Sequence, residues 1–271
     1  SDSGNKYRFD DFGTSAVTLD LQEGGTYTFD VSDSSMNSHP FVIGTAANGT
    51  EYSTGVTYKL DGVTKTYSQY TSGFSSATTR QLIFTVPNSA PALYYWCSVH
   101  SGMGGAINTN STFGSSNFDG STQTLVSTNT TAGFSIVKWT GTGGATTLGH
   151  GLGAVPKFWI IKNLDQTEDW RIYHHSIGNT KKLELNNNEA AASDISYWNN
   201  TSPTSSVMTV GSSNANNGGS RNMIAYCFAE KTGFSKFGNF SGKSDEEFVY
   251  TGFKPSFVIV KRTSTTSDWY I

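Results

Sequence analysis

The chain has 271 residues, a formal net charge of −3, and 14% charged residues against about 25% in a typical globular protein. This charge balance excludes a protein that binds nucleic acid mainly by neutralising phosphates with Lys and Arg and so releasing counterions. No apolar run approaches the roughly 20 residues that span a bilayer. Glycine contributes 29 residues and aromatic residues make up 13%. Because glycine disfavours helices and aromatic side chains favour strands, we expect a packed all-β protein.

Short strand-like runs follow one another in the N-terminal part of the chain, bounded by Gly, Asn, Asp and Ser. In residues 26–31, Tyr27, Phe29 and Val31 alternate with polar residues, which is typical of a half-buried antiparallel strand. No helical periodicity separates these runs. Residues 1–108 are therefore predicted to form one β-sandwich or barrel. The other runs are 17–21, 41–44, 82–86 and 93–96.

Residues 109–132 have a different composition, with many Ser, Thr and Asn and few apolar side chains to bury. We interpret this stretch as a linker between two domains.

The remainder, residues 133–271, contains an internal repeat. Three sequence matches recur in the same order at an offset of 99 to 100 residues. They predict a β-sandwich module with copies at 133–173 and 233–271, in which the strand after each proline is buried between two layers. The second copy is incomplete at Ile271, so we expect the natural polypeptide to continue. The matched segments are 133–135 with 233–235, 156–162 with 255–261, and 169–172 with 268–271.

The segment from Tyr94 to Gly105 carries the clearest chemical pattern. An aromatic run leads into Cys97, His100 follows three residues later, and Met103 three residues after that. A type-1 copper site needs one thiolate, two imidazoles and a weak thioether. One loop supplies three of these groups, and His39 is the candidate for the second imidazole. Two alternatives stay open: a metal-free shell in which Cys97 is a buried thiol, and a catalytic Cys–His pair, for which the sequence shows no oriented third group.

This pattern resembles the cupredoxins, with the ligand spacing of the amicyanin type, over roughly residues 4–108. The resemblance implies a Greek-key sandwich that binds one copper ion through His39, Cys97, His100 and Met103. We weigh two roles for such an ion: electron transfer, or a staple that fastens the loop after Cys97.

The sequence around these four residues resembles a more specific group of proteins than the cupredoxins as a whole. Residues 21–29, 50–56 and 94–105 are similar to a module of virion proteins of marine phages, notably cyanophages. Residues 149–153, 198–203 and 224–230 are similar to a module of phage tail-fibre and other structural proteins. The resemblance implies a non-enzymatic virion structural protein (a tail fibre, head fibre or capsid decoration) at the surface of the particle. The implied partners are other virion proteins and a host-surface carbohydrate or protein, with homo-oligomerisation as a trimer in a fibre.

Other polar groups have plainer interpretations. We expect His150, His174 and His175 to be surface or turn residues. Adjacent histidines on a strand face opposite sides, so His174 and His175 are not expected to share one metal. Asp165, Glu168 and Asp169 are interpreted as an acidic hairpin turn, and Cys227 as a small buried apolar residue.

Overall fold

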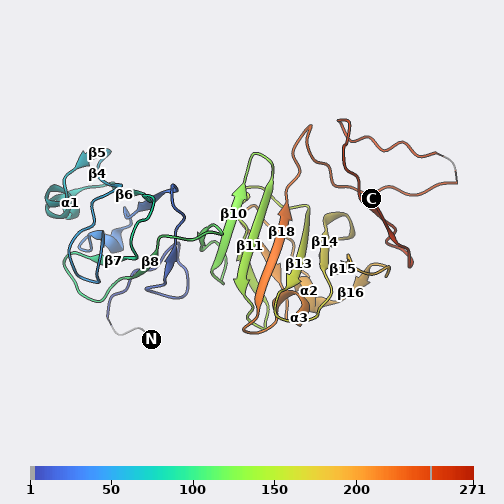
Figure 1. The fold of residues 1–271 in the computed structure, drawn as a ribbon, viewed down its shortest axis with the longest axis horizontal. Helices are drawn as coiled ribbons and strands as arrows, with labels where there is room; N and C mark the ends of the chain where they lie inside the picture. Colours follow the sequence, from blue (N-terminus) through green and yellow to red (C-terminus); the bar gives the residue numbers. More distant parts are fainter. Residues whose placement is uncertain (1–3, 245) are drawn as a thin grey trace. The chain divides into compact units, whose positions relative to one another are not determined.

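The computed structural model describes residues 4–244 and 246–271, and it divides into two compact units between Ser116 and Asn117. Strands dominate both units, which confirms the predicted all-β fold (Figure 1). In the described residues no helix combines the length and the apolar character that crossing a membrane requires.

The N-terminal unit consists of two four-stranded sheets. The first has the order β1-β8-β7-β3, with β1 parallel to β8, and the second has the order β2-β6-β4-β5. The first sheet contains β1 (Leu19–Asp20), β8 (Gly105–Asn108), β7 (Leu93–Cys97) and β3 (Phe41–Gly44). The second contains β2 (Thr26–Asp30), β6 (Arg80–Thr85), β4 (Val56–Leu60) and β5 (Val63–Lys65). The helical segments are η1 (Ser34–Met36), α1 (Tyr67–Gly73) and η2 (Phe74–Ser76).

The core of this unit is aromatic. Phe41 of β3 stacks on Tyr95 of β7 with ring centroids 5.4 Å apart, and Phe29 of β2 stacks on Phe41 at 4.9 Å. The alternation predicted for residues 26–31 is confirmed, since Tyr27 and Phe29 are half-buried between exposed polar neighbours. The hydroxyl of Tyr70 in α1 donates to the carbonyl of Phe41 at 3.2 Å, which ties the helix to β3.

The C-terminal unit is built on one large sheet with the order β16-β15-β14-β13-β18-β11-β10 (Figure 1). All of these neighbours pair antiparallel. Its strands are β10 (Thr124–Asn129), β11 (Phe134–Thr140), β13 (Phe158–Asn163), β14 (Arg171–His174), β15 (Lys181–Glu184), β16 (Ala192–Ser193) and β18 (Asn222–Phe228). A two-stranded sheet joins β12 (Thr146–Gly149) and β17 (Val207–Val210). Short helical segments are η3 (His175–Ile177), α2 (Ile195–Trp198) and α3 (Asn214–Asn217), and β9 (Ser115–Asn117) contains the division between the units.

The stretch 109–132 is not the linker that its composition predicted. Its second half contains β10, which pairs with β11 from Leu125 opposite Lys138 to Asn129 opposite Phe134. Thr124 is buried and Val126 packs against the core. Threonine favours strands, so a segment poor in large apolar residues still adds a strand to an existing sheet.

Strand β13 is covered on both faces, as its sequence predicted. Trp159 and Ile161 belong to one buried cluster, where the Trp159 ring stacks on Tyr173 with centroids 3.8 Å apart. On the opposite face, Phe158 packs with Ile172 and Leu183 in a second cluster.

The second sequence copy reproduces one hairpin of the first copy. In the first copy Ile161 of β13 lies opposite Arg171 of β14. Ninety-nine positions on, Val260 of β19 (Val260–Lys261) lies opposite Tyr270 of β20 (Trp269–Tyr270). The lysine contact recurs too, because Lys162 Nζ donates to the Glu168 carbonyl and Lys261 Nζ to the Ser267 carbonyl.

The rest of the second copy does not form the repeated sandwich predicted for 233–271. The counterpart of β11 begins at Phe234 and follows β18, as β11 follows β10. However, β18 is already paired on both edges, with β11 and with β13, so it offers no edge to this segment. Residues 233–271, here called the tail, instead place Phe237 and Trp269 against the cluster around Phe158.

The pKa of His174, about 4, predicts a pH-dependent stability. Burial lowers this pKa from 6.5, the nearby His175 adds to the effect, and the His174 Nδ1 accepts the Ser176 N–H at 3.1 Å, which requires a neutral ring. Between pH 6.5 and 4 the unfolded chain binds a proton that the folded chain does not. The resulting stability is complete above pH 6.5 and declines as the pH falls toward 4.

His174→Asn keeps an acceptor for the Ser176 N–H and removes the titration. Urea unfolding at pH 7 and at pH 4.5 should show a smaller pH-dependent loss in this variant than in the wild type. An equal loss in both proteins would mean that His174 does not titrate in this way.

Candidate metal centre

The strand register of the N-terminal unit brings His39 and Cys97 together. Phe41, the first residue of β3, lies opposite Cys97, the last residue of β7. His39 precedes Phe41 by two residues, so it reaches the same end of the sheet as the thiol. Pro40 disfavours helical backbone at His39 and keeps the chain extended as it enters β3. The Pro40 carbonyl accepts the Ser98 N–H at 3.1 Å and extends the pairing past Cys97.

The three nitrogen and sulfur donors converge without a carboxylate. The Sγ atom of Cys97 lies 3.8 Å from His39 Nδ1 and 3.7 Å from His100 Nδ1. One donor atom from each of the three residues falls within 4.8 Å of the others, and the two imidazole centroids are 4.7 Å apart. Cys97 is buried, His39 is half-buried and His100 is exposed.

The loop after Cys97 closes around this point. The backbone N–H of His100 donates to the Cys97 sulfur at 3.4 Å, which folds the loop back over the end of β7. Met103 lies further along the same loop and is only 4% exposed. Three of the four predicted residues, His39, Cys97 and His100, are therefore brought together by the entry to β3, the end of β7 and the loop that follows, and Met103 is buried further along that loop.

The N-terminal segment holds the loop in place. Tyr7 donates its N–H to the Met103 carbonyl at 2.9 Å and its hydroxyl to the His39 carbonyl at 3.0 Å. One residue therefore ties the Met103 end of the loop to the His39 turn. Lys6 Nζ donates to the Gly102 carbonyl, and the Gly102 N–H donates to Asn48 Oδ1 at 3.4 Å. The sequence did not predict these roles of Tyr7, Lys6 and Asn48, since nothing in their local pattern marks them as neighbours of Cys97.

Electrostatics favour the neutral ring of His39. Burial lowers the pKa of His39, and the nearby His100 lowers it further. The neutral ring is the form that binds a metal. Burial raises the pKa of Tyr7, as do its charge interaction and hydrogen bond with Cys97, so this hydroxyl stays protonated and remains a donor.

Two imidazoles and one thiol are donors that zinc and copper both accept, and a bound Met103 thioether would distinguish copper. Bonds of about 2.3 Å to sulfur and about 2.0 Å to nitrogen, meeting at about 120°, place the two donors about 3.7 Å apart. The sulfur–nitrogen distances of 3.8 and 3.7 Å match this trigonal arrangement. A thioether is outside the usual zinc ligands. Two imidazoles, a thiolate and a weak axial methionine form the type-1 copper set.

The remaining histidines lie elsewhere. His150 is in a turn, as expected, but it is fully buried rather than at the surface. Its Nδ1 accepts the Leu152 N–H at 3.2 Å and its Nε2 lies 3.2 Å from the Thr204 carbonyl, so both ring nitrogens serve the turn. Burial lowers its pKa. The local sequence does not indicate that His150 is buried, because the burial depends on the pairing of β12 with the distant strand β17. His174 and His175 are half-buried and do not face opposite sides: the strand ends between them, and their ring centroids are 5.2 Å apart.

The expectations for Asp165 and Cys227 are confirmed. Asp165 accepts the Asn222 N–H at 2.7 Å in the turn after β13, which is a structural role. Cys227 is buried beside Met208, with the two sulfurs 3.7 Å apart, and burial raises its pKa to about 12. A thiol with this pKa stays protonated and unreactive at neutral pH.

Comparison with known families places the larger part of the chain. The family model described as a domain of unknown function (DUF7483) matches residues 105–271, so the chain belongs to this family. The four residues of the candidate metal centre lie before the matched region. No curated protein and no solved structure matches the chain.

Gly104 is predicted to be essential for the closed loop. A Cβ atom there would overlap the Tyr95 carbonyl in β7, and backbone cannot swing aside as a side chain can. Gly104→Ala should lower the free energy of unfolding of the N-terminal unit by about 1–3 kcal/mol, as overpacking does. Urea denaturation measures this change.

Gly13→Ala is the matched control, because nothing lies within 4 Å of a Cβ at Gly13. Its stability should stay at the wild-type value or rise by up to about 1 kcal/mol. Equal effects of the two substitutions would contradict the tight loop.

Proposed function

We propose that the chain is a virion structural protein whose N-terminal unit binds one copper ion through His39, Cys97, His100 and Met103. The observation that carries the copper proposal is the convergence of two imidazoles and one thiol, distant in sequence, at one end of a sheet. The virion proposal draws on the resemblance of both modules to phage structural proteins. It includes a place at the particle surface, contacts with other virion proteins and with the host, and no catalytic role.

The ion's proposed role is a structural staple. The four ligands join two chain segments that the fold otherwise links through β3–β7 pairing and the Tyr7 contacts. Binding only to the folded state stabilises it by about 4 kcal/mol when free metal exceeds Kd a thousandfold. For a domain of this size that corresponds to a rise in melting temperature on the order of 15 °C.

One observation favours electron transfer as a second role. His100 is exposed while Cys97 is buried, so one ligand ring would connect a shielded ion to solvent. Copper held by this set supplies one-electron exchange. A reversible one-electron couple in voltammetry of the copper-loaded protein, with rapid exchange to a soluble protein partner, would favour this role over a purely structural one.

Copper(II) added to the purified protein should produce an intense thiolate-to-copper absorption near the red end of the visible spectrum. Cys97→Ser should remove the colour and the copper-dependent rise in melting temperature, while the metal-free fold survives. The control is Cys227→Ser, which alters the other thiol, buried in the C-terminal unit. Absence of colour in the wild type, with an unchanged melting temperature, would contradict copper binding.

The virion proposal has a separate test. Mass spectrometry of density-purified particles from a phage that encodes the chain should detect its peptides in a stoichiometric amount. Antibody against the N-terminal unit should label intact particles. Particles that lack these peptides would contradict the proposal, whatever the outcome with copper.

A further inference from the structure

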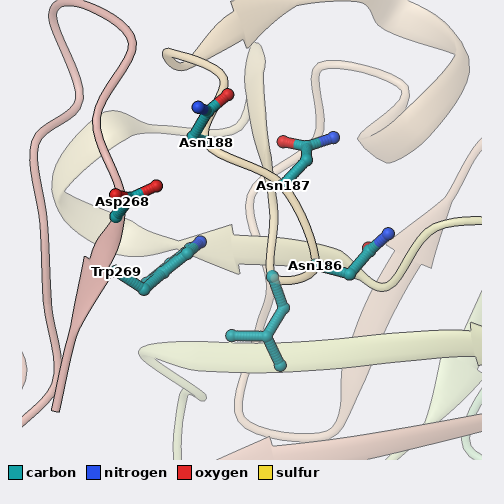
Figure 2. A pocket seen from close by; sticks show the side chains of 6 residues that line it. Asn186, Asn187, Asn188, Asp268 and Trp269 are labelled. Carbon is teal, nitrogen blue, oxygen red and sulfur yellow. The ribbon is translucent and has the colours of Figure 1, made fainter.

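An open hollow of about 410 Å³ lies on the C-terminal unit, at the junction of the two sequence copies. One wall is the loop after β15, residues 185–188, and the other is the start of β20, with Asp268 and Trp269 (Figure 2). Its volume falls within the range of about 300–1,000 Å³ that small-molecule sites occupy. The whole hollow belongs to one unit.

Trp269 is held in a fixed orientation. Its indole N–H donates to the Glu184 carbonyl at 2.9 Å, and its ring packs against the cluster of Phe158, Ile172 and Leu183. The Lys261 ammonium lies 5.9 Å from the ring centre. The ring nevertheless remains half-buried rather than enclosed, and it lines the hollow. Lys261 lies over the ring, and the part of the ring that lines the hollow has its orientation set before any ligand arrives.

The loop that faces Trp269 is also fixed by its own contacts. Asn186 accepts the Trp170 N–H at 3.0 Å and donates to Asp169 Oδ1 at 2.8 Å. Asn187 donates to the Glu184 carboxylate and accepts the Glu189 N–H at 3.0 Å. The side-chain amides of Asn186 and Asn187 are therefore engaged in hydrogen bonds that hold the loop.

Two polar side chains of the hollow remain available. Among the described residues, neither the Asn188 amide nor the Asp268 carboxylate has a hydrogen-bond partner, and both residues are exposed; Asp268 interacts with the charge of Lys261. Asn188 lies across the hollow from Asp268 and Trp269 (Figure 2). The backbone carbonyl of Asn188 accepts the Ser267 N–H at 2.8 Å and Lys261 Nζ at 3.0 Å. These hydrogen bonds join the two walls of the hollow and leave the Asn188 and Asp268 side chains out of the contact.

We propose that this hollow is a binding site for a neutral carbohydrate. A pyranose ring has an apolar face of C–H groups, which packs on an aromatic ring, and hydroxyls at its edge, which pair with polar groups. Trp269 supplies the aromatic surface, Asp268 accepts from hydroxyls, and Asn188 both donates and accepts. Asp268 lines the hollow, whereas Lys261 does not and donates its Nζ to the Asn188 and Ser267 carbonyls. The group that a ligand meets is therefore the carboxylate, which repels anionic sugars, so sialylated and uronic-acid ligands are disfavoured. This inference deepens the host-contact part of the proposed function and is independent of the copper site.

The experiment applies the full chain to an array of immobilised oligosaccharides. The neutral set ends in glucose, mannose, galactose or N-acetylglucosamine, and the anionic set ends in sialic acid or glucuronic acid. At least one neutral class should bind saturably and the anionic set should not. Trp269→Ala and Asp268→Ala should each weaken that binding about tenfold or more, and Trp269→Phe should restore part of it.

Tyr250→Ala is the matched control, since Tyr250 is 77% exposed and does not line the hollow. This variant should bind like the wild type. Absence of binding to every neutral sugar overturns the proposal, as does binding that persists in both Trp269→Ala and Asp268→Ala. Copper titration of the same preparations keeps the outcomes distinct: lost sugar binding with retained colour rejects only the hollow, and lost colour with retained sugar binding rejects only the metal centre.

Discussion

The antiparallel register of β3 and β7 is the constraint on which the candidate metal centre depends. Phe41 opposite Cys97 fixes His39 at the end of the sheet where β7 delivers its thiol. A shift of one residue would turn Phe41 out of the aromatic core and move the imidazole to the other face. Stacking of Phe41 on Tyr95 and Phe29 therefore holds the register, and with it the positions of the ligands. Core packing and the convergence of the candidate ligands are thus set by the same pairs of residues.

A different constraint organises the C-terminal unit, whose central strand needs cover on both faces. One face of β13 is covered by a large cluster that includes Trp159 and Trp198. The other face has a small cluster around Phe158, and the tail of the second copy contributes Phe237 and Trp269 to it. The tail is therefore fastened where the first copy has apolar surface left to bury.

Glu184 connects this packing to the surface of the unit. Its carboxylate pairs with Arg171 and Lys182, and both cations lie near the Tyr197 ring. Burial is the largest cause that lowers the pKa of Lys182, which shows the cost of placing the ammonium there. Removing one partner of such a buried pair typically costs about 3–5 kcal/mol. The Glu184 carboxylate also accepts from Asn187, and the Glu184 backbone carbonyl accepts from the Trp269 indole, so both walls of the hollow are bonded to this residue.

Sequence predicted the features that follow from local patterns. The alternation at Tyr27 and Phe29 marked a strand, the two-faced apolar run at Phe158 marked a buried one, and the spacing of Cys97, His100 and Met103 marked a loop. Features that depend on distant pairing escaped it. Thr124 and its neighbours form a strand because β11 offers an edge, whereas Phe234 and its neighbours do not, since β18 has none left. The hollow at Trp269 arises only where the second copy packs on the first.

X-ray absorption at the copper edge tests the central claim most directly, because it reports which atoms bind the ion. The structure predicts one sulfur from Cys97 and two imidazole nitrogens, from His39 and His100, bonded to copper in the loaded protein. His39→Ala should leave the sulfur bonded and remove one nitrogen. A copper environment of nitrogen and oxygen alone, or one unchanged by loss of His39, would contradict the convergence of these side chains.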